Sequence, residues 1–109
     1  MAMVVKRAEI WLVSLNPTIG KEIQKTRPCM IISPDEANKY LDTVIVAPLT
    51  SSYKNYPSRV NCKFDGKEGQ IVIDQIRSVD KVRLSKKLGM IDKSSSQKVF
   101  SLLQEYFSY

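Results

Sequence analysis

Short apolar runs, each ended by turn residues, occupy the first four-fifths of this chain. Their length and their β-branched side chains predict strands rather than helices. We expect strands over Ile10–Leu15, Pro28–Ile32, Thr43–Leu49 and Ser58–Phe64, and one or two more over Gln70–Ile73 and Gln75–Val79. The run Thr43–Leu49 is largely β-branched and apolar, which predicts a strand buried on both faces.

Two segments predict helices. Ser33 followed by Pro34 is typical of a helix start, with Ser33 as the capping residue. Near the end, Ser94–Gln97 resembles a capping box. The apolar residues that follow it at helical spacing are Val99, Phe100, Leu103, Tyr106 and Phe107.

The order of these elements, several strands and then a terminal helix, predicts the fold class. We expect an α+β domain built as a small curled antiparallel β-sheet or SH3-like barrel, with a short helix and an amphipathic C-terminal helix. With 109 residues and no repeat or linker, the chain is expected to form one domain over residues 1–109.

Basic residues outnumber acidic ones by 17 to 11, which gives a net charge of +6. Such a surplus favours polyanions, with nucleic acid ahead of an anionic membrane, although many basic surfaces bind neither. No apolar run is long enough to cross a bilayer. Lys6 and Arg7 follow too short an apolar stretch for a secretory signal, so we expect a cytoplasmic protein.

Histidine is absent, and the two cysteines, Cys29 and Cys62, form no metal-binding motif. We therefore expect no metal site and no cofactor, and two thiols rather than a disulfide. Any catalysis must rely on arginine, lysine, carboxylate and hydroxyl groups.

Polar clusters beside strand ends are the places where such catalysis could occur, because scaffolded loops commonly carry function. Three qualify: Glu22–Arg27, Thr50–Ser52 and Asp74–Arg77. Each also has an ordinary structural explanation, such as a solvated loop arginine, a hydroxyl that caps a strand end or an ion pair. Composition and spacing do not choose between these readings.

Several blocks of sequence resemble the MazF/PemK family of toxin endoribonucleases. They are Glu9–Glu22, Thr26–Pro28, Ala47–Ser51 and Asp74–Leu84, and together the resemblance spans about residues 6–107. The chain departs from the family pattern at two positions. Ala8 replaces a usual glycine, and Lys21 stands where some members, including the Kid type, carry a functional histidine.

The resemblance implies a metal-independent endoribonuclease that cuts single-stranded RNA through attack of the ribose 2′-OH, leaving a 2′,3′-cyclic phosphate or 3′-phosphate and a 5′-OH. It assigns Arg27 to the phosphate charge and Thr50 to a hydrogen bond with a phosphate oxygen. Glu22 and Asp74 are candidates for the proton transfers. An exposed carboxylate is a weak base unless its pKa is raised, so these assignments stay open.

The resemblance also implies a basic groove for single-stranded RNA. Its candidate residues are Lys21, Lys25, Ser51, Lys54, Tyr53, Tyr56, Gln75, Arg77 and Arg83. Tyr53 and Tyr56 either stack on bases or pack at the rim of the barrel. The implied partners are a second copy of the chain and a cognate antitoxin with an acidic, disordered segment. The basic run Lys81–Lys87 either faces one of these partners or is a solvated surface.

Two rival functions remain. Gyrase poisons of the CcdB type share this fold, but their gyrase contact resembles a Trp-Gly-Ile terminus, whereas this chain ends in Tyr106–Tyr109 and has its single tryptophan at position 11. The other rival is a catalytically inactive nucleic-acid-binding barrel, because fold alone does not determine function.

Overall fold

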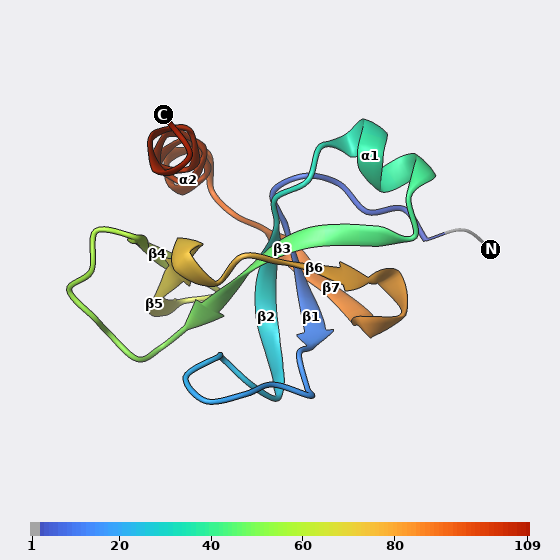
Figure 1. Ribbon diagram of the computed structural model, residues 1–109, viewed down its shortest axis with the longest axis horizontal. Helices are drawn as coiled ribbons and strands as arrows, with labels where there is room; N and C mark the ends of the chain where they lie inside the picture. Colours follow the sequence, from blue (N-terminus) through green and yellow to red (C-terminus); the bar gives the residue numbers. More distant parts are fainter. Residues whose placement is uncertain (1–2) are drawn as a thin grey trace.

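A computed structural model describes residues 3–109 of the chain (Figure 1). In chain order its elements are β1 (Glu9–Ser14), β2 (Thr26–Ile31), α1 (Asp35–Tyr40), β3 (Thr43–Thr50), β4 (Arg59–Phe64), β5 (Lys67–Val72), η1 (Ile73–Gln75), β6 (Arg77–Asp80), η2 (Lys81–Arg83), β7 (Leu84–Met90) and α2 (Lys93–Tyr106). The elements η1 and η2 are single 3₁₀ turns. Within residues 3–109, no helix has the length and apolar content that a membrane-spanning segment requires.

The strands form one antiparallel sheet in the order β4-β5-β3-β2-β1-β7, and β6 pairs separately with β3. One edge of β3 serves two partners, because Thr43–Val46 pair with β6 and Leu49–Thr50 pair with β5. The sheet therefore turns along β3, and Figure 1 shows this strand running from β6 to the β4–β5 hairpin. The predicted α+β class with a curled antiparallel sheet is confirmed.

Side chains of the central strands alternate between two hydrophobic cores, as the period of two in a strand requires. One core contains Val5, Trp11, Val13, Leu15, Cys29, Ile31, Val44, Val46, Val79 and Leu84. The other contains Ile10, Met30, Ile32, Ala47, Leu49, Val60, Ile71, Ile73, Ile91 and Val99. Helix α2 packs on the second core through Val99, so the central strands are covered on both faces.

Two details of the strand predictions were wrong. Burial on both faces holds for the second half of β3 but not for Ile45, which is 40% exposed. Strand β7 was not predicted at all, because most of its residues are exposed and show no alternation. Its strand conformation results from pairing with β1, which involves two register shifts.

Both predicted helix caps were also wrong. Helix α1 begins at Asp35 with Pro34 as its N-cap, while the buried Ser33 hydroxyl donates to Asn38 Oδ1. Helix α2 is capped two residues earlier than expected by Asp92, whose carboxylate accepts a 2.9 Å hydrogen bond from Ser95 N. A carboxylate at an N-cap also interacts favourably with the helix dipole, which explains why Asp92 begins the helix.

The residue that departs from the family's usual glycine lies in a conformation that suits glycine. Ala8 has φ 73°, the left-handed region in which a Cβ is strained. Its N–H donates to Ile31 O at 2.9 Å and its carbonyl accepts from Ile91 N at 3.0 Å. These two backbone bonds hold Ala8 in this conformation.

The residue after Ala8 in the sequence, Glu9, is a buried carboxylate. Glu9 is 3% exposed and accepts hydrogen bonds from Lys6 N at 2.7 Å and Trp11 Nε1 at 3.0 Å. Lys87 Nζ lies 2.6 Å from its other oxygen. Burial by itself raises the pKa of Glu9, but the bonds from Lys87, Lys6 and Trp11 together bring that pKa below its ordinary value.

Candidate active site

Arg27 and Thr50 border the same surface hollow, which has a volume of about 270 Å³. Strands β2 and β3 position them. The two strands are antiparallel and Cys29 pairs with Pro48, so Arg27, two residues before Cys29, lies level with Thr50, two residues after Pro48. The hollow, called here the Arg27 hollow, is lined by Arg27, Pro28, Leu49, Thr50, Ser51, Cys62, Phe64, Asp65, Lys67, Glu68, Gly69 and Leu88.

The Arg27 side chain is half-buried and held at one point. Its Nε donates to the carbonyl of Gln24 at 3.2 Å. Its two terminal amino groups make no other hydrogen bond within residues 3–109. A guanidinium fixed through Nε with free terminal groups can make paired hydrogen bonds to a phosphate.

The Thr50 hydroxyl is oriented by the backbone that follows it. Thr50 Oγ1 accepts a hydrogen bond from Ser52 N at 3.1 Å. The oxygen is therefore used as an acceptor, and its proton remains available to donate. Arg27 and Thr50 thus present hydrogen-bond donors to one hollow.

The carboxylates of Glu22 and Asp74 border a different hollow of about 350 Å³, together with Gln75 and Arg77. The Glu22 carboxylate accepts a 2.6 Å hydrogen bond from Ile19 N, a contact within its own loop. Both candidate carboxylates therefore stand apart from the lining of the Arg27 hollow.

Asp74 has structural contacts of its own. It accepts from the Ser58 hydroxyl at 2.8 Å and lies 3.7 Å from Arg59 Nε. The Arg59 side chain is 8% exposed, and its Nε has no hydrogen-bond partner in the part of the chain that the structure describes. Asp74 is the nearby counter-charge for this buried cation.

Two arginines predicted to bind RNA donate hydrogen bonds to backbone carbonyls. Arg77 Nη1 donates to Leu15 O at 2.9 Å. Arg83 Nη1 donates to the carbonyls of Ser14, at 3.1 Å, and Asn16. Both guanidiniums hold the end of β1 and the start of the following loop.

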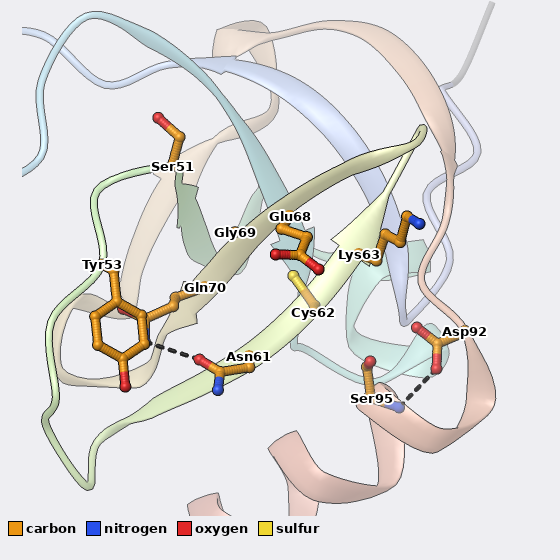
Figure 2. A pocket seen from close by; sticks show the side chains of 10 residues that line it. All are labelled: Ser51, Tyr53, Asn61, Cys62, Lys63, Glu68, Gly69, Gln70, Asp92 and Ser95. Atoms are coloured by element: carbon orange, nitrogen blue, oxygen red, sulfur yellow. Dashed lines mark hydrogen bonds between the residues drawn. The ribbon is translucent and has the colours of Figure 1, made fainter.

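Ser51, Tyr53 and Tyr56 lie on the loop after Thr50. Tyr53 is 65% exposed and Tyr56 is 52% exposed, so both side chains are accessible to solvent. The Arg59 guanidinium lies 5.3 Å from the centre of the Tyr56 ring. Figure 2 shows Tyr53 at the edge of a third hollow. This hollow has a volume of about 690 Å³ and shares Ser51, Cys62, Glu68 and Gly69 with the Arg27 hollow.

A family model for the PemK-like, MazF-like toxin of type II toxin–antitoxin systems matches residues 6–107. The chain belongs to this family. It is 32% identical over 108 residues to endoribonuclease EndoA of Bacillus subtilis (strain 168), which covers 94% of this chain and 93% of the relative. This MazF-like toxin is accordingly an endoribonuclease.

Solved structures show the same fold. MazF from Deinococcus radiodurans (Form-I) has a TM-score of 0.87 at 24% identity, and the match covers 99% of the toxin and 100% of that chain. An endoribonuclease from mycobacterial species, solved in complex with its cognate antitoxin, has a TM-score of 0.78 at 20% identity, over 93% and 92% of the two chains.

The structure of the toxin adds two carboxylates to the candidate site that the sequence analysis did not identify. Asp65 and Glu68 line the Arg27 hollow, because the β4–β5 hairpin folds back towards the end of β3. Figure 2 shows the Glu68 carboxylate beside Cys62. In the sequence they appear as ordinary charges near a turn, so no local signal distinguishes them.

Both cysteines of the toxin are free thiols, as expected. Burial raises the pKa of Cys29 to about 12. Cys62 is half-buried, and burial with the negative charge of Asp92 raises its pKa to about 11. Neither thiol is activated as a nucleophile near neutral pH. Residues 3–109 contain no group of three or more histidine, cysteine, aspartate or glutamate side chains placed to hold a metal ion.

Proposed function

We propose that this MazF-like toxin cleaves single-stranded RNA without a metal ion, through attack of a ribose 2′-OH on the adjacent phosphate. The products are a 2′,3′-cyclic phosphate, or its hydrolysed 3′-phosphate, and a 5′-OH. The observation that supports this proposal is the shared hollow of Arg27 and Thr50, in which both groups retain free donors.

The two residues stabilise the charge that develops on the phosphate. The terminal amino groups of Arg27 donate to phosphate oxygens, and the Thr50 hydroxyl donates to a non-bridging oxygen. Each donor is held before the substrate arrives, so little reorganisation is needed as the transition state forms. A single donor of this kind contributes about 3 kcal/mol to transition-state stabilisation.

The reaction requires two proton transfers. The O2′–P bond forms as the 2′-OH loses its proton, and the P–O5′ bond breaks as O5′ gains one. Glu22 and Asp74 remain candidates for these transfers, although each already accepts a hydrogen bond. Glu68 and Asp65 join them as candidates, because they border the same hollow as the proposed phosphate site.

The surface around the hollow fits a single strand. Lys21, Lys25 and Lys54 belong to exposed loop segments and supply positive charge for the RNA backbone. The exposed rings of Tyr53 and Tyr56 offer faces on which unpaired bases stack.

We also propose that the toxin acts as a homodimer and is inhibited by a cognate antitoxin. The mycobacterial relative solved with its antitoxin supports the second part of this proposal. With its net charge of +6, the toxin would attract an acidic, disordered antitoxin segment.

The decisive experiment incubates the purified toxin with a long single-stranded RNA in EDTA and maps the cut ends. We expect discrete cuts with 5′-OH ends, absent for Arg27→Ala and retained for Lys98→Ala, a charge-matched control on the exposed face of α2. Loss of all cleavage in EDTA would contradict metal independence. Intact RNA, with folded and antitoxin-free protein, would favour a gyrase poison or an inactive nucleic-acid-binding barrel.

A further inference from the structure

Two loops adjoin the strands that carry Arg27 and Thr50, one before β2 and one after β3. Residues 15–25 connect β1 to β2, and residues 51–58 connect β3 to β4 (Figure 1). They carry the lysines and tyrosines proposed to contact RNA. Loops of this length are mobile unless their backbone groups find partners.

Gln70 supplies such partners to the second loop. Its side chain is almost fully buried on β5, and its Oε1 accepts from Lys54 N at 3.0 Å. Its Nε2 donates to Lys54 O at 3.0 Å and to Asn61 Oδ1 at 2.9 Å. The amide thus binds both backbone groups of Lys54, as a neighbouring strand would. In Figure 2, the Gln70 side chain extends towards Tyr53, and a dashed line marks its hydrogen bond to Asn61.

Gln75 does the same for the first loop. It lies at the end of η1, and its Oε1 accepts from Ile23 N at 2.7 Å. Its Nε2 donates to Lys21 O at 3.3 Å. Two amides from one short segment, β5 to η1, therefore hold both loops: the first contains Gln24, whose carbonyl binds Arg27, and the second begins directly after Thr50.

We infer that Gln70 and Gln75 are positioning residues, which hold the two loops in the arrangement that binds an RNA strand across Arg27 and Thr50. This inference rests on the proposed function. An amide suits the task because it offers a donor and an acceptor without adding a charge beside the RNA. Loops ordered in advance lose less conformational entropy when the strand binds, so the glutamines act on substrate binding.

The test replaces each glutamine with methionine, which has a similar length and makes no comparable hydrogen bond. Gln97→Met, at an exposed position on α2, is the matched control. With a short single-stranded RNA containing a mapped cleavage site, we expect KM to rise about tenfold in Gln70→Met and in Gln75→Met. We expect kcat to stay within about twofold of wild type, because the hydrogen bonds that orient Arg27 and Thr50 do not involve either glutamine. The control should match the wild type in both.

Amide hydrogen exchange shows whether each loop has been released. Exchange at Lys54 should accelerate in Gln70→Met only, and exchange at Ile23 in Gln75→Met only. Faster exchange with an unchanged KM would overturn the inference and leave the proposed function intact. A fall in kcat that follows the unfolding midpoint, with KM unchanged, would also overturn it, because the glutamines would then only stabilise the fold.

Two further outcomes are decisive. If Gln70→Met does not fold, Gln75→Met decides the question, because Gln75 is half-exposed and its loss disturbs less of the interior. If the wild-type toxin leaves every RNA intact, the proposed function fails, and this inference fails with it.

Discussion

A Cβ atom on Gly69 would lie 2.7 Å from the carbonyl oxygen of Thr50, closer than real Cβ contacts come. Strand β5 passes this close because Thr50 pairs with Gln70, the residue after Gly69. The glycine is thus required by the approach of two backbones, and the position of Thr50 at the end of β3 depends on it.

Gly69→Ala should therefore displace the end of β3 and with it the Thr50 hydroxyl. We expect kcat for RNA cleavage to fall by about ten- to a hundredfold, because small displacements of catalytic groups are costly. Gly66→Ala is the control. It strains a turn residue with φ 75° but meets no atom within 4 Å, so it should lower stability and leave kcat unchanged. Equal kcat values for both variants would contradict this account.

Thr50→Val keeps the shape of the side chain and removes its hydroxyl. The free donor is lost, and we expect kcat to fall by about 10²–10³-fold with little change in the unfolding midpoint. Thr50→Ser retains the hydroxyl and should keep most of the activity. Single-turnover cleavage of a short RNA measures both variants, and an active Thr50→Val would remove the hydroxyl from the mechanism.

Ala8→Gly should stabilise the toxin, because glycine adopts the φ of 73° without strain. Relief of a left-handed residue gains about 1–2 kcal/mol, and the freer unfolded chain offsets about 0.4–1 kcal/mol of this gain. Denaturant unfolding should show a higher free energy of unfolding. Ala37→Gly, within helix α1, should instead lower it by about 1 kcal/mol. A destabilised Ala8→Gly would show that the Cβ of Ala8 is not strained.

Glu9 should make the toxin sensitive to acid. Its pKa in the folded protein is lower than the ordinary value of 4.5, so its stabilising effect is present above that value. The effect is lost as the pH falls below 4.5 and through the folded pKa, where the carboxylate takes up a proton.

The corresponding experiment measures the free energy of unfolding between pH 7 and pH 3. Glu9→Gln should be less stable at pH 7 by about 1–3 kcal/mol and should show a shallower loss in acid, because the charge facing Lys87 is already gone. Glu36→Gln, exposed on α1, should keep the wild-type pH dependence. Identical pH profiles for wild type and Glu9→Gln would exclude Glu9 as the source of the acid sensitivity.

Much of the fold could be predicted from local sequence. Short apolar or alternating runs located β1 to β4, and helical spacing around Val99 located α2. These signals are local, because a strand or helix that buries one face must repeat its apolar residues with a fixed period. The sequence blocks likewise indicated Arg27 and Thr50, which the fold brings to one hollow.

Only the tertiary structure decided how the remaining polar residues are used. It separated Glu22 and Asp74 from the Arg27 hollow and brought Glu68 to it. It also placed the side chains of Gln70 and Gln75 within hydrogen-bond distance of loop backbones that are distant in sequence. These outcomes depend on where the sheet curls and how its strands are registered. Registers and curvature arise from packing between distant segments, so no local period in the sequence encodes them.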